Sequence, residues 1–305
     1  MITEKKLDGF NNKLNYATLN YPQCTCGKCP RFYWNMLSIA ARQSGKTYTI
    51  CQMIKHWEKN TILKDGVKHK LRTILISPTI QANEIYKSLD SLDFENDCYD
   101  DYSDDILLNI IDDVKTRKKE YEEYIEYVEA YKKFIKIPDD KLEDYYDKNP
   151  EDFKLLEKHD FIHYKELPHK EPEVVIILLD DLLGTGSFST KQRSALTNNL
   201  IKNRHNGVCF AILAQSIKSV PKNIRLNCSL FFLGKFQSKK VILEDVYEEI
   251  SNVCTIEQFE ELYTYATDKP YGALIIDTTH KGKRFLSNFD TELFMEGVNT
   301  DEEKK

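Results

Sequence analysis

The fold expected of this 305-residue chain is decided by the stretch Asn35-Met36-Leu37-Ser38-Ile39-Ala40-Ala41-Arg42-Gln43-Ser44-Gly45-Lys46-Thr47. Its first six residues are mostly apolar and predict a short strand. Apolar residues then recur at intervals of three and four, which predicts a helix, at Ile50, Met53, Ile54 and Trp57. A strand, a loop with glycine and a helix in this order present free backbone N–H groups that bind phosphate.

The loop carries most of the Walker A pattern, G-x-x-x-x-G-K-[ST]. Ala40 stands at the first glycine position, which only requires that the backbone there avoid a glycine-only conformation. We expect Lys46 to reach the β- and γ-phosphates of ATP and the Thr47 hydroxyl to bind Mg²⁺. A chance Gly-Lys-Thr after a strand is the alternative. The residues expected to bind the nucleotide are Ala41, Arg42, Gln43, Ser44, Gly45, Lys46, Thr47 and Tyr48.

A second part of the site is expected where the run Val174-Val175-Ile176-Ile177-Leu178-Leu179 leads into Asp180 and Asp181. A run without alternation is typical of a strand buried on both faces of a parallel sheet. Such sheets bind ligands at the carboxyl ends of their strands, as in a Walker B motif. We expect Asp180 to hold Mg²⁺ through water and Asp181 to orient or deprotonate the attacking water. Glutamate is more usual at the second position, and an acidic turn is the alternative.

Two further candidates flank the strand predicted over residues 207–214. Gln215 follows this strand and is expected to sense the γ-phosphate; a glutamine that only caps the strand is the alternative. Arg204 precedes the strand and is expected to reach the γ-phosphate of a neighbouring subunit. Such an arginine finger stabilises charge in the transition state. An ordinary surface arginine is the alternative, and Arg225 and Arg42 are rival fingers.

The remaining pattern predicts an α/β fold, a P-loop NTPase with a mainly parallel central sheet flanked by helices, plus an acidic helical insertion. Other strands are predicted over 72–77, 230–233 and 272–277, and helices over 80–89, 189–203 and 256–265. The expected organisation is an irregular lead-in over 1–34, a P-loop ATPase domain over 35–290, and a disordered acidic tail over 291–305.

The insertion is expected between about residues 90 and 170, where Asp, Glu, Lys and Tyr dominate. Part of it keeps a helical period, which predicts a solvated helix with one packed face. The members of this face are Tyr121, Tyr124, Ile125, Val128, Tyr131, Phe134 and Ile135. A charged helix without a chemical role is the favoured interpretation.

The chain is acidic overall, with 43 Lys and Arg against 49 Asp and Glu and a formal net charge of −6. No global field therefore attracts nucleic acid, and any DNA contact must be local. A local basic patch is expected after Gln215, with a solvated surface as the alternative. Its members are Lys218, Lys222, Arg225, Lys235, Lys239 and Lys240. No apolar run reaches the roughly 18 residues that span a bilayer, so we expect a soluble intracellular chain without a membrane span.

A cysteine cluster near the start is a weak candidate for zinc. Cys24, Cys26 and Cys29 offer three thiolates, whereas a structural zinc site needs four ligands. Because no fourth Cys or His lies close in sequence, a turn with reduced thiols is favoured.

The order of these motifs resembles the FtsK–HerA-type genome-packaging ATPases of large DNA viruses, in their poxvirus-like branch. The resemblance rests on residues 40–47, Ile177-Leu178-Leu179-Asp180-Asp181-Leu182, Asn203-Arg204-His205, and the stretches 214–228 and 259–272. It implies a ring-forming, hexameric motor that uses ATP to push double-stranded viral DNA into a capsid. A capsid or portal component would be its partner, in the virion or the host cytoplasm at the viral assembly site.

The resemblance also implies the roles already argued for Lys46, Thr47, Asp180, Asp181 and Gln215, with Arg204 as the finger that acts in trans. The loop from Arg42 to Thr47 is also similar to the ATPase half of phage large terminases. In terminases this ATPase domain is normally joined to a nuclease domain, and no nuclease domain is expected after residue 290. The alternatives are therefore a terminase- or helicase-like DNA-dependent ATPase, or a nucleotide-dependent assembly protein without a DNA substrate.

Overall fold

The computed structural model describes residues 21–26, 30–168, 170–182, 194–236, 238, 242–251, 253–279 and 284–295. The lead-in up to residue 20, Cys29, Lys239, Lys240 and the tail from residue 296 lie outside these residues. Among the described helices, none combines the length and apolar character needed to cross a bilayer.

The strands are β1 (Gln23–Cys24), β2 (Asn35–Ile39), β3 (Ile62–Lys64), β4 (Val67–Ile76), β5 (Cys98–Tyr99), β6 (Glu173–Asp180), β7 (Val208–Ala214), β8 (Leu230–Gly234), β9 (Ala273–Asp277), β10 (Arg284–Ser287) and β11 (Thr291–Leu293). The α-helices are α1 (Lys46–Glu58), α2 (Asp104–Phe134), α3 (Leu142–Lys148), α4 (Pro150–Lys158), α5 (Ala195–Ile201), α6 (Asn203–Asn206), α7 (Lys222–Arg225), α9 (Tyr247–Ile250) and α10 (Ile256–Ala266). Shorter helical turns are η1 (Ile80–Ala82), η2 (Glu84–Ser88), η3 (Asp139–Lys141), η5 (Ile217–Ser219) and η6 (Ile242–Val246).

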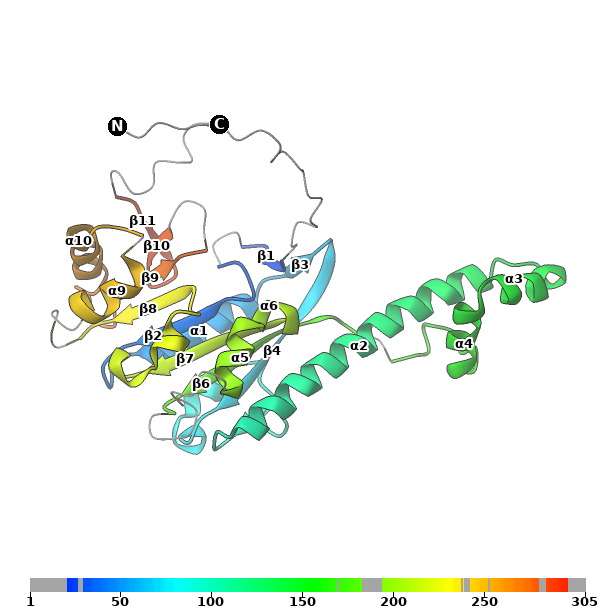
Figure 1. Ribbon diagram of the computed structural model, residues 1–305, viewed down its shortest axis with the longest axis horizontal. Helices are drawn as coiled ribbons and strands as arrows, with labels where there is room; N and C mark the ends of the chain where they lie inside the picture. Colours follow the sequence, from blue (N-terminus) through cyan, green and yellow to red (C-terminus); the bar gives the residue numbers. More distant parts are fainter. Residues whose placement is uncertain are drawn as a thin grey trace, which may run out of the picture.

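One mixed sheet runs through the molecule in the order β1-β3-β4-β6-β7-β2-β8-β9-β10-β11, with β5 paired to β4 (Figure 1). The central strands β4, β6, β7, β2 and β8 are parallel, and β5 pairs with β4 in the same direction. The strands at the two ends of the order continue the sheet antiparallel. The carboxyl ends of the central strands therefore lie along one edge. This confirms the predicted fold class of a mainly parallel central sheet flanked by helices.

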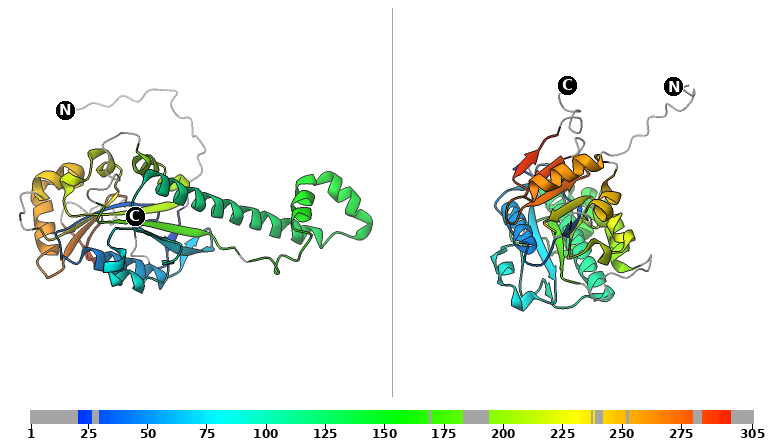
Figure 2. Two further views of the ribbon diagram at one scale, coloured as in Figure 1. Left: turned by 90° about the horizontal axis from the view of Figure 1, so that it is seen from below. Right: turned by 90° about the vertical axis from the view of Figure 1, so that its left-hand side faces the viewer.

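Helices cover both faces of this sheet, and Figure 2 shows α1 and α2 on opposite sides of it. The first half of α2 packs with α5 and α10 against one face, where Ile177 and Phe210 are buried. On the other face α1 and Tyr86 of η2 pack against Leu178. Burial on both faces explains why the run in β6 is apolar without alternation.

The sequence-based expectation for residues 80–89 is wrong in kind, because they form the turns η1 and η2 rather than an α-helix. Asn83 separates the two turns with a non-helical backbone, and Tyr86 is then buried in the core. The helix predicted over 189–203 is described from Ala195 onward, as α5 and α6. Residues 189–193 lie outside the described part of the chain.

The packed domain extends past both expected boundaries. In the part of the expected lead-in that the structure describes, β1 pairs with β3, and the fully buried rings of Phe32 and Trp34 lie 5.5 and 5.6 Å from that of Trp57. At the other end β11 pairs with β10, and Leu293 is buried in the core. Aromatic burial and strand pairing therefore hold residues that composition alone places outside the domain.

The first part of the expected insertion belongs to the domain. β5 pairs with the central strand β4, and the first half of α2 buries Leu107, Ile110 and Ile111 against the sheet. The insertion proper begins near residue 115, where α2 leaves the body. Residues 115–170, here called the arm, project away from the sheet with α3 and α4 at the far end (Figure 1).

The arm has a small core of its own, formed by Tyr127, Ala130 and Leu156. The predicted packed face is therefore partly wrong, because Ile125 and Ile135 are exposed while Tyr127 is fully buried. Tyr127 is held by its hydroxyl, which donates a hydrogen bond to the carbonyl of Ile162 at 2.5 Å. The arm is thus folded rather than merely solvated.

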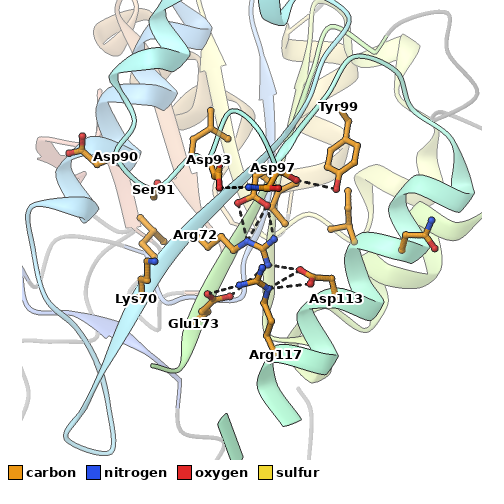
Figure 3. A pocket seen from close by; sticks show the side chains of 16 residues that line it. Lys70, Arg72, Asp90, Ser91, Asp93, Asp97, Tyr99, Asp113, Arg117 and Glu173 are labelled. Atoms are coloured by element: carbon orange, nitrogen blue, oxygen red, sulfur yellow. Dashed lines mark hydrogen bonds and ion pairs between the residues drawn. The ribbon is translucent and has the colours of Figure 1, made fainter. Parts of the chain in front are cut away.

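Charged side chains fix the base of the arm around a cavity of about 500 Å³ (Figure 3). Arg72 of β4 donates to Asp97 at 2.6 Å and to Asp113 of α2 at 2.7 Å. Arg117 lies 3.1 Å from Asp113 and 3.7 Å from Glu173 at the start of β6. These ion pairs tie α2 to both β4 and β6, so the arm leaves the body from a fixed point.

Candidate nucleotide-binding site

The loop between β2 and α1 has a backbone suited to phosphate. Gly45 is the N-cap of α1 with φ of 81°, and Gln43 also has a positive φ of 59°. The first N–H groups of α1 have no partner within the helix, and the helix dipole adds partial positive charge there. They border a cavity of about 320 Å³. An anion fits this end of the helix.

All eight residues predicted to bind nucleotide line this cavity, and so do Asp180, Asp181 and Gln215. The structure therefore brings together Walker A, Walker B and the polar residue after β7 at one edge of the sheet. Thr79 and Asn83, which follow β4, also line the cavity and were not predicted. Only the position after a central parallel strand could have indicated them.

Alanine at the first position of the motif is explained by the neighbouring strand. Ala40 is fully buried, and its N–H donates to the carbonyl of Ala214 at 3.3 Å. A side chain on Gly234 of β8 would place its Cβ only 2.6 Å from the Ala40 Cβ. The methyl group of Ala40 thus occupies space that Gly234 leaves open.

The Asp180 carboxylate is the meeting point of three elements. Its Oδ2 accepts a hydrogen bond from the Thr47 hydroxyl of α1 at 3.0 Å and another from the Tyr86 hydroxyl of η2. Burial, and then the nearby Asp180 charge, raise the pKa of Tyr86 well above its usual range, so Tyr86 stays a donor. Tyr86 was not predicted, because no motif marks it.

The Lys46 ammonium lacks full compensation in this cavity. Burial lowers its pKa, and the charges of Asp180 and Asp181 oppose this shift only in part. A partly buried cation in such a state gains from a further anion. A bound phosphate group would supply that anion.

Asp181 is turned into the cavity by an unusual backbone. Its φ is +55°, which is uncommon for a residue other than glycine. The Gln215 amide donates from Nε2 to Asp181 Oδ1 at 3.0 Å. The carboxylate is thus oriented by the residue at the tip of β7, as a water-positioning group requires.

The residues present fit a magnesium ion. The Thr47 hydroxyl and the Asp180 carboxylate are hard oxygen ligands held side by side at the phosphate-binding loop. Mg²⁺ is bound in proteins by one or two such groups together with substrate phosphates. Thr47 and Asp180 would hold it here.

The structure separates the candidate arginine fingers. Arg204 lies on α6, before the amino end of β7, and its guanidinium packs over the ring of Tyr21 at 5.9 Å. Arg225 is largely buried and pairs with Glu249 at 2.9 Å. Arg42 is exposed in the phosphate-binding loop itself. Within one chain, only Arg42 among them lies at the nucleotide edge.

Most of the described part of the expected basic patch is neutralised by the chain's own carboxylates. Its members Lys218, Lys222 and Arg225 pair with Asp245, Glu248 and Glu249 at 3.2, 2.8 and 2.9 Å. Lys235 is exposed, and Lys239 and Lys240 lie outside the described residues. The three ion pairs leave the described part of the patch with little net charge, and the solvated-surface alternative describes it better.

The described part of the cysteine cluster forms no metal site. Cys24 is buried beside β3 and Cys26 is partly buried, while Cys29 lies outside the described residues. Where the structure describes the chain, no three His, Cys, Asp or Glu side chains are placed to share a metal ion.

Comparison with known proteins finds no matching family model and no matching curated protein. Among solved structures, the chain is similar to the genome packaging NTPase B204 from Sulfolobus turreted icosahedral virus 2 in complex with AMP. The identity is 15%, over 81% of this chain and 93% of that one, with a TM-score of 0.39. It is also similar to the DNA-packaging ATPase B204 from Sulfolobus Turreted Icosahedral Virus, at 14% identity over 84% and 96%, with a TM-score of 0.43.

A third similar structure is the cytoplasmic domain of the Thermomonospora curvata Type VII secretion ATPase EccC. The identity is 10% over 86% of this chain and 26% of that one, with a TM-score of 0.39. Structural similarity at this level of identity gives no information about the roles of individual side chains. The chemistry of the site therefore rests on its own geometry.

Proposed function

We propose that this chain is a Mg²⁺-dependent ATPase of the FtsK–HerA type that acts as a ring-shaped motor and moves double-stranded DNA into a viral capsid. Its partners would be DNA, further copies of the chain, and a capsid or portal component at the viral assembly site. The poxvirus-like branch is the part of the family that its motifs resemble.

One observation carries the enzymatic part of this proposal. The Thr47 hydroxyl and the Asp180 carboxylate, 133 residues apart in the chain, lie 3.0 Å apart at the carboxyl edge of the sheet. Beside them Gln215 orients Asp181. Chance matches to two short motifs would not converge in this way.

The residues divide the work of hydrolysis. The N–H groups at the start of α1 and the Lys46 ammonium bind the phosphates. Mg²⁺, when bound by Thr47 and Asp180, supplies charge neutralisation for the triphosphate. Asp181 orients the attacking water and takes its proton, while Gln215 holds Asp181 in place and senses whether the γ-phosphate is present. An arginine from a neighbouring chain would complete the charge stabilisation.

The test is ATP hydrolysis with and without linear double-stranded DNA, with the Lys46→Ala variant as the blank. Stimulation by duplex that is lost in this variant would support the motor. The terminase- and helicase-like alternatives would then be separated from it by strand-separation and blunt-duplex translocation assays. Turnover that ignores DNA in an oligomeric sample would overturn the motor.

A second candidate function is a nucleotide-dependent assembly protein without a DNA substrate. The neutralised lysines of the described patch favour it, because phosphate contacts need uncompensated positive charge. The same assay decides between the two, since an assembly protein would hydrolyse ATP at a rate independent of duplex.

A further inference from the structure

An exposed tyrosine covers the phosphate-binding loop from the side opposite the carboxylates. The ring of Tyr271 packs on Gly45 so closely that a Cβ on Gly45 would lie 2.9 Å from Tyr271 Cδ1. The same tyrosine is 66% exposed, so most of its ring surface has no protein partner. A large aromatic ring in this state is placed against the loop without being part of the core.

The backbone holds Tyr271 there at a cost. Its φ is +60°, a left-handed conformation that is unusual for an aromatic residue. The turn is closed by the Gly272 N–H, which donates to the carbonyl of Lys269 at 3.0 Å. A Cβ on Gly272 would collide with the carbonyl oxygen of Ala266. Strained conformations of this kind cluster at ligand sites.

The strand order places different residues on the two sides of the phosphate-binding loop. Asp180, Asp181 and Gln215 follow β6 and β7, on one side of β2, and mark the γ-phosphate end of the nucleotide. Tyr271 precedes β9, beyond β8 on the other side of β2. With the γ-phosphate at the carboxylates, the base of the nucleotide is directed toward the side of Tyr271.

We propose that Tyr271 is the base-stacking residue of the nucleotide site, an inference that rests on the nucleotide-binding function proposed above. The free face of its ring stacks on the base while the other side rests on Gly45. The free energy of stacking depends on the area of the base and not on its hydrogen-bonding groups. Stacking on Tyr271 therefore favours purines over pyrimidines and does not distinguish adenine from guanine. The substrate class is then a purine nucleoside triphosphate.

The test compares two probes, a non-hydrolysable ATP analogue and inorganic tripolyphosphate, by equilibrium binding to the wild-type chain and to Tyr271→Ala. The expected result is about tenfold weaker binding of the ATP analogue with unchanged binding of tripolyphosphate. Tyr271→Phe should bind both probes as wild type does. Tyr265→Ala removes a ring that is 69% exposed on α10 and serves as the matched control.

The outcomes separate this inference from the proposed function. Wild-type protein that binds neither probe contradicts the nucleotide site itself. Wild-type binding of both, with Tyr271→Ala unchanged or weakened equally for both probes, overturns the stacking role alone. A wild-type preference for the ATP and GTP analogues over those of CTP and UTP, lost in Tyr271→Ala, completes the expected result.

Discussion

At the scale of single residues, the site depends on how Asp180 is shared. One carboxylate oxygen accepts from both the Thr47 and Tyr86 hydroxyls. Groups behind a metal ligand fix its orientation and tune its affinity. If Asp180 holds Mg²⁺ as proposed, Tyr86 is a positioning residue for the metal rather than a catalytic one.

Replacing Tyr86 with phenylalanine should raise the Mg²⁺ concentration needed for half-maximal ATP hydrolysis about tenfold, because the ligand loses its orienting donor. Turnover at saturating Mg²⁺ should stay within a few-fold of wild type. The measurement is a Mg²⁺ titration of ATPase rate. Tyr127→Phe, which removes a buried hydroxyl in the arm, is the control and should leave the titration unmoved. An unshifted midpoint in Tyr86→Phe would contradict this role.

Lys46→Met should make the nucleotide-free protein slightly more stable while abolishing ATP hydrolysis. The folded-state pKa of Lys46 is lowered, so the protonated side chain destabilises the fold, and this effect is fully present below that pKa. It fades as the pH rises toward the unfolded value of about 10.4. Thermal unfolding at pH 7 and pH 10 should show a gain of about 2 °C that narrows at the higher pH. A loss of stability at pH 7 would refute it.

Single residues also show where sequence reasoning reaches its limit. Lys46, Thr47 and Asp180 could be named because each belongs to a short pattern that follows an apolar run. Tyr86 lies in the short turn η2, and only the tertiary fold brings its hydroxyl to Asp180. The tolerance of Ala40 likewise depends on Gly234, which is a contact between strands that no local pattern contains.

At the scale of elements, three ion pairs connect the segment after Gln215 to the segment of η6 and α9. They join Lys218, Lys222 and Arg225 to Asp245, Glu248 and Glu249. The innermost pair is the buried one, with side-chain exposures of 15% for Arg225 and 3% for Glu249. The segment that follows Gln215 is thus fixed to a neighbouring element.

Arg225→Ala should lower the stability of the domain by about 3 to 5 kcal/mol, because Glu249 is left buried without its partner. The double change of Arg225→Met with Glu249→Leu should recover most of the loss, as seen by denaturant unfolding. Lys222→Ala breaks an exposed pair and should leave the midpoint unchanged. If the double variant keeps its ATPase rate, Arg225 is structural; if it folds but does not turn over, Arg225 remains a rival finger.

Helices and strands could be predicted from the sequence where an apolar pattern continues over many residues. They could not be predicted where the secondary structure depends on pairing or packing with a distant segment. The run in β6 and the spacing in α1 are long enough to stand alone. Residues 80–89 form turns because this conformation lets Tyr86 be buried in the core. The short strands β1 and β11 form because they pair with the edges of β3 and β10. Such pairing partners are distant in the chain or too short to show alternation.

At the scale of the whole molecule, the arm is an appendage whose two ends meet. Lys170 pairs with Glu120 at 2.8 Å, and Arg117 with Glu173 at 3.7 Å. Its small core shares no residue with the clusters that pack against the sheet. The arm can therefore be separated from the nucleotide site.

Deleting residues 121–169 and joining residues 120 and 170 through about four glycine and serine residues should leave a folded ATPase. Basal hydrolysis without DNA should stay within about twofold of wild type, because the deletion removes no residue that lines the nucleotide cavity. Circular dichroism and ATPase rate are the measurements. A soluble, folded variant without basal turnover would show that the arm contributes to the site.

The proposed ring can be tested through Arg204, which lies at the far edge of the sheet from its own nucleotide site. Arg204 precedes β7 and Gln215 follows it, and seven extended residues span about 23 Å. Arg204 therefore cannot reach the nucleotide site of its own chain, and it could act as a finger only in trans. Arg204→Ala should reduce turnover by at least about a thousandfold if it is the finger in trans.

Mixing Arg204→Ala with Lys46→Ala in equal amounts should then restore activity at about a quarter of the subunit contacts. At those contacts an intact P-loop from the first variant faces an intact arginine from the second. The measurement is the ATPase rate of chains mixed and reassembled, with each variant alone as the control. If Arg204 only packs on Tyr21, the ATPase rate of the Arg204→Ala variant is not increased by mixing it with Lys46→Ala.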